Sequence, residues 1–181
     1  MTQYVAFLRG INVGGKKPIR MKELADVMSD AGFHNVRTFI ASGNVIFQAP
    51  AKDSTRLAKR MEKELVKAFG FEITVIIRTI DELKAIIELN PFGKPKPSVD
   101  EMLFVTFFAG PLAAKPKLPL RSKTDNMEVI ALTDGAAFIV ARRKKTGWFG
   151  FPHTFAEKQF RVPTTTRNWT TVVKIVAAAE R

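Results

Sequence analysis

The stretch VRTFIASGNVIFQ, residues 36–48, decides how the first half of this chain folds. Two runs rich in β-branched and aromatic residues, 36–41 and 44–48, are separated only by Ser42 and Gly43. Such runs favour strands, and a two-residue gap containing glycine is a hairpin signal. The sequence therefore predicts two antiparallel strands joined by a tight turn.

The segments on either side of this hairpin extend the pattern. Residues 4–9 form a short apolar run that predicts a buried strand. Apolar residues recur at helical spacing over 21–31 and 57–69, and each of these segments is followed by a glycine, Gly32 and Gly70, at the position of a C-cap. Residues 71–78 predict a fourth strand. The order strand, helix, strand, strand, helix, strand is that of the ferredoxin-like unit.

The second half has a different pattern. A short helix is expected over 81–89, and the prolines from Pro91 to Pro97 predict an extended linker. Further strands are expected at 102–108 and in a hairpin, 128–133 and 136–142, which turns at Asp134-Gly135. A short helix at 154–160 and a last helix that carries Trp169 and is capped by Thr166 complete the chain.

The predicted fold class is therefore α+β. We expect an N-terminal ferredoxin-like βαββαβ subdomain, residues 1–90, and a smaller basic α+β subdomain, residues 91–181, packed on it.

The composition excludes several classes of site. Cysteine is absent, so the chain has no disulfide and no thiolate ligand, and the only histidines are His34 and His153. We expect no metal and no cofactor. A signal peptide and a run of membrane-spanning length are not evident, so the expected location is the cytoplasm and no membrane partner is expected.

The charge is strongly positive and uneven. Lys and Arg number 29 against 17 Asp and Glu, for a net charge of +12. Residues 1–90 carry 14 basic and 10 acidic side chains, a net of +4, whereas residues 91–181 carry 15 and 7, a net of +8. An excess of this size favours a polyanionic partner.

A glycine-rich loop follows the first strand. Residues 10–16, GINVGGK, satisfy the G-x-x-x-x-G-K part of a phosphate-binding loop. Lys17 stands where that motif needs Ser or Thr for magnesium, and Pro18 follows, which argues against a nucleotide-hydrolysing site. A simple turn and an anion site made of glycine N–H groups remain the two alternatives.

Topology adds neighbours to this loop. In a ferredoxin-like sheet the first and third strands are adjacent and antiparallel, so the end of one lies beside the start of the other. We therefore expect a polar corner that could bind a small anion or a nucleotide phosphate. The residues of this predicted site are Arg9, Asn12, Gly14, Gly15, Lys16, Ser42 and Asn44, and Arg167 and Asn168, at the predicted start of the last helix, are added as further anion ligands.

A second candidate lies in the basic half. Arg142, Arg143, Lys144 and Lys145 precede Trp148, and Phe149 and Phe151 follow. Cations beside aromatic rings are the ingredients of nucleic-acid binding, because they contact phosphates and stack on bases. The alternative is a solvated hairpin end that leads into buried aromatics.

The first half does not suit recognition of RNA on an open sheet. Its expected strands, such as 5–8, 45–47 and 73–77, are apolar on both faces, so no face is left for stacked bases. We expect the second half or a partner subunit to cover the face that the two helices leave open.

Three stretches, residues 4–16, 36–47 and 165–172, together resemble the family called domain of unknown function 1697. The resemblance implies an α+β fold and assigns no activity, substrate or catalytic residue. Residues 148–152, WFGFP, depart from it, because a more polar stretch with a Ser-Lys pair would be expected there.

Three functions remain open. The first is binding of an anionic partner, with nucleic acid ahead of a phosphate-bearing small molecule. The second is an enzyme that acts on a phosphorylated small molecule at the glycine-rich corner. The third is a protein-interaction module. Paired carboxylates and serine-histidine arrangements at diagnostic spacing do not stand out, so the sequence leaves open whether the protein is an enzyme, and it does not fix the oligomeric state.

Overall fold

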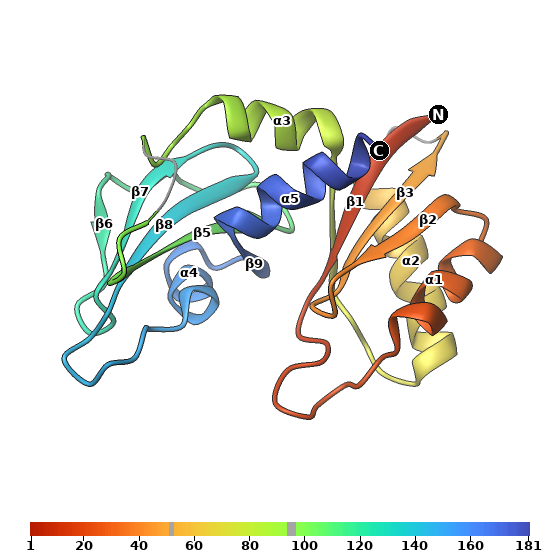
Figure 1. Cartoon of the computed structure of the whole chain (residues 1–181), viewed down its shortest axis with the longest axis horizontal. Coiled ribbons are helices and arrows are strands. Elements are labelled where there is room, and N and C mark those ends of the chain that lie inside the picture. The colour runs from red at the N-terminus through yellow and green to blue at the C-terminus, as the bar shows by residue number, and fades with distance from the viewer. Residues whose placement is uncertain (51–52, 94–96) are drawn as a thin grey trace. The chain divides into compact units, whose positions relative to one another are not determined.

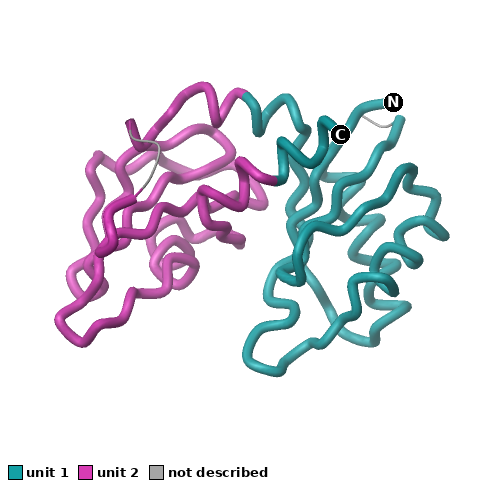
Figure 2. The backbone as a smooth tube through the Cα atoms, viewed as in Figure 1, with its two compact units in different colours: residues 1–84, 175–181 teal, residues 85–174 magenta. Residues whose placement is uncertain are grey.

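A computed structural model describes residues 1–50, 53–93 and 97–181, and residues 94–96 of the expected linker lie outside these ranges. The chain divides into two compact units (Figure 2). The first comprises Met1–Lys84 together with Ile175–Arg181, and the second is Ala85–Lys174. The predicted division at residue 90 assigned the whole C-terminal helix to the second half, whereas the structure places its last turns in the first unit. The predicted mixed α+β class is confirmed.

The first unit is a four-stranded antiparallel sheet in the order β2-β3-β1-β4. Along the chain the elements are β1 (Thr2–Leu8), α1 (Met21–Asp30), β2 (His34–Phe39), β3 (Asn44–Ala49), α2 (Ser54–Phe69) and β4 (Val75–Thr79). β1 pairs with both β3 and β4, with Tyr4 opposite Phe47 on one side and Thr79 on the other. The end of β1 therefore lies beside the start of β3.

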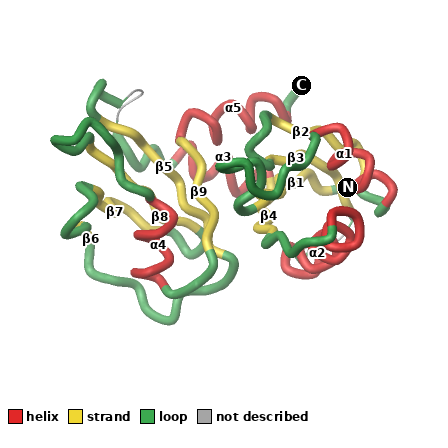
Figure 3. Tube along the Cα trace, turned by 90° about the horizontal axis from the view of Figure 1, so that it is seen from below, coloured by secondary structure: helices red, strands yellow, loops and turns green. Residues whose placement is uncertain are grey.

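Alternation along β1 divides this unit's core between two faces. Tyr4, Ala6 and Leu8 belong to a buried cluster with α1 and α2, to which Leu24 and Met61 contribute. Both helices lie on the same side of the sheet, and the end of the last helix lies on the other (Figure 3). Val5 and Phe7, which alternate with the first set, are also fully buried. Within the described strands β1–β4 no Phe, Tyr or Trp side chain is exposed, as the sequence predicted.

The second unit is a five-stranded antiparallel sheet in the order β6-β7-β8-β5-β9. Its strands are β5 (Glu101–Phe108), β6 (Leu120–Arg121), β7 (Met127–Leu132), β8 (Ala136–Arg142) and β9 (Thr164–Asn168). Helix α4 (Pro152–Phe160) follows β8. Helices α3 (Ile80–Glu88) and α5 (Trp169–Ala179) carry the chain from one unit to the other (Figure 1).

Aromatic side chains build the core of the second unit. Phe155 and Phe160 of α4 pack on one face of the sheet, where the ring centroids of Phe160 and Phe108 are 5.0 Å apart. Phe92 packs edge-on against Phe138 of β8 at 6.0 Å and against Trp169 at 5.3 Å. Trp169 is thus a core anchor at the start of α5.

Two predicted boundaries are wrong. Thr166 does not cap the last helix but lies within β9, where its Oγ1 is 2.8 Å from Oγ1 of Thr106 on β5. The turn between β2 and β3 is not a two-residue turn, because Phe39 pairs with Asn44 and leaves Ile40–Gly43 as the loop. Ile40 and Gly43 have φ values of 51° and 78°, so the loop reverses the chain through two left-handed residues. The Asp134-Gly135 turn between β7 and β8 is seen as predicted, with a bond from Thr133 N to Ala136 O of 2.9 Å.

Candidate functional site

The glycine-rich loop of the first unit is a closed hairpin tip. Lys16 N donates to Val13 O at 3.1 Å, and Gly14 and Gly15 between them have φ values of 58° and 73°. Two consecutive positive φ values are the mark of a type I′ turn. Asn12 N also donates within the loop, to Lys17 O at 3.1 Å. The N–H groups of Asn12 and Lys16 are thus used inside the hairpin.

Asn12 joins this hairpin to the neighbouring loop. Its Oδ1 accepts from Ile19 N at 2.8 Å, and its Nδ2 donates to Ile19 O at 3.0 Å and to Ala41 O at 2.9 Å. The loops after β1 and before β3 do converge, as the topology predicted. The side chain that joins them already has three hydrogen bonds, which suits a structural role better than ligand binding.

The turn before β3 is held in the same manner. Asn44 is fully buried, and its Nδ2 donates to Phe39 O at 2.9 Å and to Ser42 Oγ at 3.0 Å. Gly43 is packed so closely that a Cβ there would lie 2.9 Å from Ile11 Cδ1. Arg9, the other member of this corner, is half-buried, and its backbone N–H donates to Thr74 O. Ser42 and Asn44 therefore build the turn.

The two lysines of the hairpin differ. Lys17 Nζ donates to Glu72 O, and its ammonium lies 5.5 Å from the centre of the Phe71 ring. Both partners follow directly after helix α2, so Lys17 lies at the C-terminal end of that helix. Lys16, Gly14 and Gly15 are exposed.

Arg167 and Asn168 belong to the second unit, so the structure does not show them as part of the glycine-rich corner. Arg167 is only 9% exposed, and its Nη1 donates to Thr165 Oγ1 at 2.8 Å and to Thr166 O at 2.9 Å. Burial lowers the pKa of Arg167 to about 10, which leaves the guanidinium charged at neutral pH. The side chain is held within the sheet edge.

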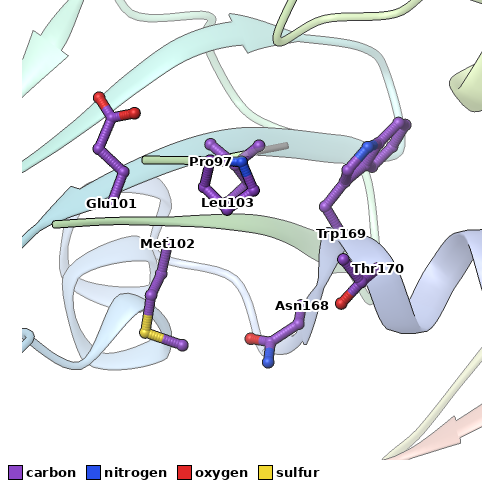
Figure 4. A pocket seen from close by; sticks show the side chains of 7 residues that line it. All are labelled: Pro97, Glu101, Met102, Leu103, Asn168, Trp169 and Thr170. Carbon is purple, nitrogen blue, oxygen red and sulfur yellow. The ribbon is translucent and has the colours of Figure 1, made fainter. Parts of the chain in front are cut away.

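Asn168 lies at the rim of a small apolar hollow of about 100 Å³ (Figure 4). Its other lining residues are Pro97, Glu101, Met102, Leu103, Trp169 and Thr170. Sites for small molecules are typically about 300–1,000 Å³, so this hollow is too small for a whole metabolite.

The basic segment 142–144 is neutralised by carboxylates that are distant in sequence. Arg142 Nη1 is 3.2 Å from Glu128 Oε2, Arg143 Nε is 3.0 Å from Asp100 Oδ1, and Lys144 Nζ is 2.8 Å from Asp125 Oδ1. The three cations and Asp100 line a shallow polar hollow of about 480 Å³, together with Lys145. Three of the four predicted nucleic-acid-binding cations thus hold the loop to its own unit.

The aromatics that follow are split between core and solvent. Trp148 is 77% exposed and Phe151 is 71% exposed. Phe149 between them is half-buried, under the guanidinium of Arg143 at 4.9 Å. The sequence alternative of a hairpin leading into buried aromatics therefore holds only for Phe149.

A set of cations that the sequence interpretation did not single out lies on helix α2. Arg56, Lys59, Arg60, Lys63 and Lys67 are all exposed. Their spacing of three and four residues was the available signal, because that period places side chains on one face of a helix. The set is the only exposed row of five cations on one helix in residues 1–50, 53–93 and 97–181.

Neither a metal site nor a membrane-spanning helix is found in residues 1–50, 53–93 and 97–181. They contain no group of three or more His, Asp or Glu residues placed to hold a metal ion. In the same residues, no helix is both long and apolar enough to cross a membrane.

Known proteins place the chain in a family. One solved structure, that of the conserved bacterial protein SP0830 from Streptococcus pneumoniae, is similar over 100% of this chain and 99% of its own, with a TM-score of 0.68 and 20% identity. At that identity the likeness shows a shared fold alone. Among curated proteins none matches. The family described as "Protein of unknown function (DUF1697)" matches residues 1–138, about three quarters of the chain. This range contains two of the three stretches that carried the resemblance, 4–16 and 36–47, and the chain therefore belongs to the DUF1697 family.

Proposed function

We propose that this protein binds nucleic acid, and that the loop between β8 and α4 stacks on bases of a single strand. The observation that carries the proposal is the pair of exposed rings, Trp148 and Phe151, which follow the exposed Lys145 by three and six residues in the same loop. Large aromatic side chains are normally buried, because each covers 150–250 Å² of apolar surface. Proteins that bind single strands present such rings beside cations.

The loop that carries the rings is braced from within. Lys144 N donates to Trp148 O at 2.8 Å and Gly147 N donates to Lys144 O at 2.8 Å. The guanidinium of Arg143 adds a bond to Gly147 O at 3.0 Å. Because the loop is already held in one conformation, binding costs little conformational entropy of the loop, which favours binding. The ion pairs of Arg143 with Asp100 and of Lys144 with Asp125 hold the loop that carries the two rings. Lys145 is exposed, so its ammonium can contact a phosphate.

A phosphorylated small molecule at the glycine-rich hairpin is the weaker candidate. Asn12 and Asn44, the amides predicted to contact it, are used by the hairpin and the turn themselves. An interaction module that uses the two exposed rings is the third candidate, and the experiment below separates it from nucleic-acid binding.

The test is a fluorescence titration of the whole chain with single-stranded DNA, single-stranded RNA and duplex DNA at 50 and 200 mM salt. The expected result is preference for single strands, and quenching of Trp148 while the buried Trp169 is unaffected. Replacing both rings, Trp148→Ala with Phe151→Ala, removes stacking worth about 1–3 kcal/mol per base, so binding should weaken at least tenfold.

The control is Leu89→Ala, which removes another exposed apolar side chain, 55% exposed, from the second unit. An equal loss in this control, or no binding of any nucleic acid at 50 mM salt, would overturn the proposal. In that case a role in protein interaction becomes the better explanation of the two rings.

A further inference from the structure

Helix α2 presents one exposed face made of cations. At 100° per residue, Arg56, Lys59, Arg60, Lys63 and Lys67 lie within an arc of about 100°. The opposite side carries Leu57, Met61 and Leu65, which are buried in the core of the first unit. The helix is therefore fixed with its basic face toward solvent.

The ends of α2 are firmly held. Asp53 Oδ1 accepts from Thr55 N at 2.9 Å and from Arg56 N at 3.1 Å, and Gly70 closes the helix in the left-handed conformation. A row of charges on such a helix keeps its spacing. At about 1.5 Å per residue, the row from Arg56 to Lys67 is about 16 Å long, and neighbouring cations are about 1.5–6 Å apart along the axis.

The acidic residues of α2 do little to neutralise this row. Glu62 is turned to the sheet, where its Oε1 accepts from Val75 N at 2.8 Å. Glu64 lies 3.9 Å from Lys67, and an exposed pair at this distance contributes little. Arg60 differs from its neighbours, because it stacks on Phe33 at 4.9 Å and donates to Ala31 O at the end of α1.

The glycine-rich hairpin extends the basic region beyond α2. Lys17 is bonded to Glu72 O, two residues past Gly70, and Lys16 next to it is exposed. The lysines of the hairpin thus add charge at the end of the helix where the row stops.

We propose that the exposed face of α2 binds the sugar-phosphate backbone of a nucleic acid. The inference rests on the proposed function, in which the loop of the second unit stacks on bases. It adds a second contact surface, α2 of the first unit, which contacts phosphates. A row of cations along one face of a helix that is capped at both ends fits a polymer with a phosphate on every nucleotide, and such contacts carry no sequence preference.

The surroundings of the row favour nucleic acid over a membrane. A helix that lies in a membrane surface needs an apolar face free to enter the lipid. The apolar face of α2 is buried in the protein core, and only Val66, 40% exposed, interrupts the cationic side. Phosphatidylserine vesicles are the alternative ligand in the test of this inference.

The test replaces four cations of α2 by glutamine, which has a helix propensity similar to that of Lys and Arg. Arg60 is kept because it also holds the end of α1. The variant combines Arg56→Gln, Lys59→Gln, Lys63→Gln and Lys67→Gln. The slope of log K against log salt is negative, and each lost phosphate contact makes it less steep by about 0.7 for a single strand. Loss of four contacts should therefore reduce the magnitude of the slope by about 3.

The matched control removes the same charge from other exposed cations: Lys22→Gln, Lys115→Gln, Lys117→Gln and Lys174→Gln. This control should change the slope by less than about 1, the share of one phosphate contact. Equal slopes in the two variants would overturn the inference. Loss of binding to phosphatidylserine vesicles in the α2 variant, with its nucleic-acid binding intact, would also overturn it.

The two proposals fail in distinguishable ways. If the Trp148 and Phe151 variant loses binding and the α2 variant behaves like its control, only the role of α2 is wrong. If the α2 variant loses its salt slope and the ring variant binds normally, only the stacking loop is wrong. If the wild-type protein binds no nucleic acid at 50 mM salt, both are wrong.

Discussion

Two basic segments of this molecule use their charges in opposite ways. The cations of residues 142–144 each lie within 3.2 Å of a carboxylate oxygen from another part of the second unit. The cations of α2 face solvent, and within residues 1–50, 53–93 and 97–181 the one ion pair they form is that of Lys67 with Glu64 at 3.9 Å. The denser cluster in the sequence is thus the less available one in the structure. Local charge density measures how many cations are present, and the fold decides which of them a partner can reach.

The largest loss of stability is expected where Gly150, in the loop between β8 and α4, packs against Asp125. A Cβ on Gly150 would lie 2.8 Å from Asp125 Cβ and 2.9 Å from Asp125 O, so Gly150→Ala has to displace the loop. We expect a loss of about 2–3 kcal/mol in the free energy of unfolding, measured by urea denaturation.

Gly110→Ala is the control for this change, because nothing lies within 4 Å of its Cβ position and its φ is not positive. It should leave stability unchanged or raise it slightly. Similar losses for the two variants would show that the loop is not braced by this contact.

The next largest effect is expected from removing a carboxylate, which should destabilise the protein more beside residues 142–144 than on α2. Glu128 accepts from Arg121 and Arg142 and its side chain is only 14% exposed, so Glu128→Ala leaves two guanidinium groups without this partner. We expect a loss of about 1–2 kcal/mol by thermal or urea unfolding. Glu64→Ala on α2 is the counterpart and should cost less than about 0.5 kcal/mol. A larger loss for Glu64→Ala than for Glu128→Ala would reverse the comparison.

An acidic residue can also be added to α2. Lys59→Glu would place a carboxylate four residues before Lys63, the favourable orientation for a helical ion pair, and should stabilise the protein by about 0.3–0.5 kcal/mol. The same change should weaken nucleic-acid binding, measured by anisotropy at fixed salt. Stabilisation with unchanged binding would mean that the α2 cations are not contact residues.

The smallest effect concerns pH. The hydrogen bond from Lys144, assisted by one from Thr124, holds the pKa of Asp125 below its usual value. A carboxylate whose pKa is lowered by folding stabilises the protein above its unfolded pKa of about 4, and that contribution is lost as pH falls through the folded pKa. Between pH 6 and pH 3, wild type should therefore lose slightly more stability than Lys144→Met. Equal pH dependence would show that the pair contributes nothing.

Most elements could be predicted from the chain because apolar periodicity reports which face is buried. β1, α1, α2 and the hairpin of β7 and β8 all follow that signal. β9 does not, because residues 164–168 read TTTRN, and a threonine before a helical pattern looks like a cap. Its strand pairing depends on β5, which lies about sixty residues earlier in the chain. A local pattern contains no information about that partner.

The candidate site was predictable only in part, for the same reason. The convergence of Asn12 with the loop before β3 followed from sheet topology. Sheet topology could not predict that the side-chain amide of Asn12 forms its hydrogen bonds with Ile19 and Ala41, because hydrogen-bond partners depend on loop conformation. Nor could the sequence show that Asp100 and Asp125 lie beside Arg143 and Lys144. The exposure of Trp148 likewise depends on the packing around it, which no local sequence pattern reports.

The division of the chain also sets an order in time. The first unit includes residues 175–181, yet the ninety residues of the second unit are synthesised before them. At about 5–20 residues per second, the first eighty-four residues wait roughly 5–20 s for the segment that completes their unit. The second unit is continuous and can fold as it leaves the ribosome. During synthesis, the half of the protein that is made first is therefore the half that is finished last.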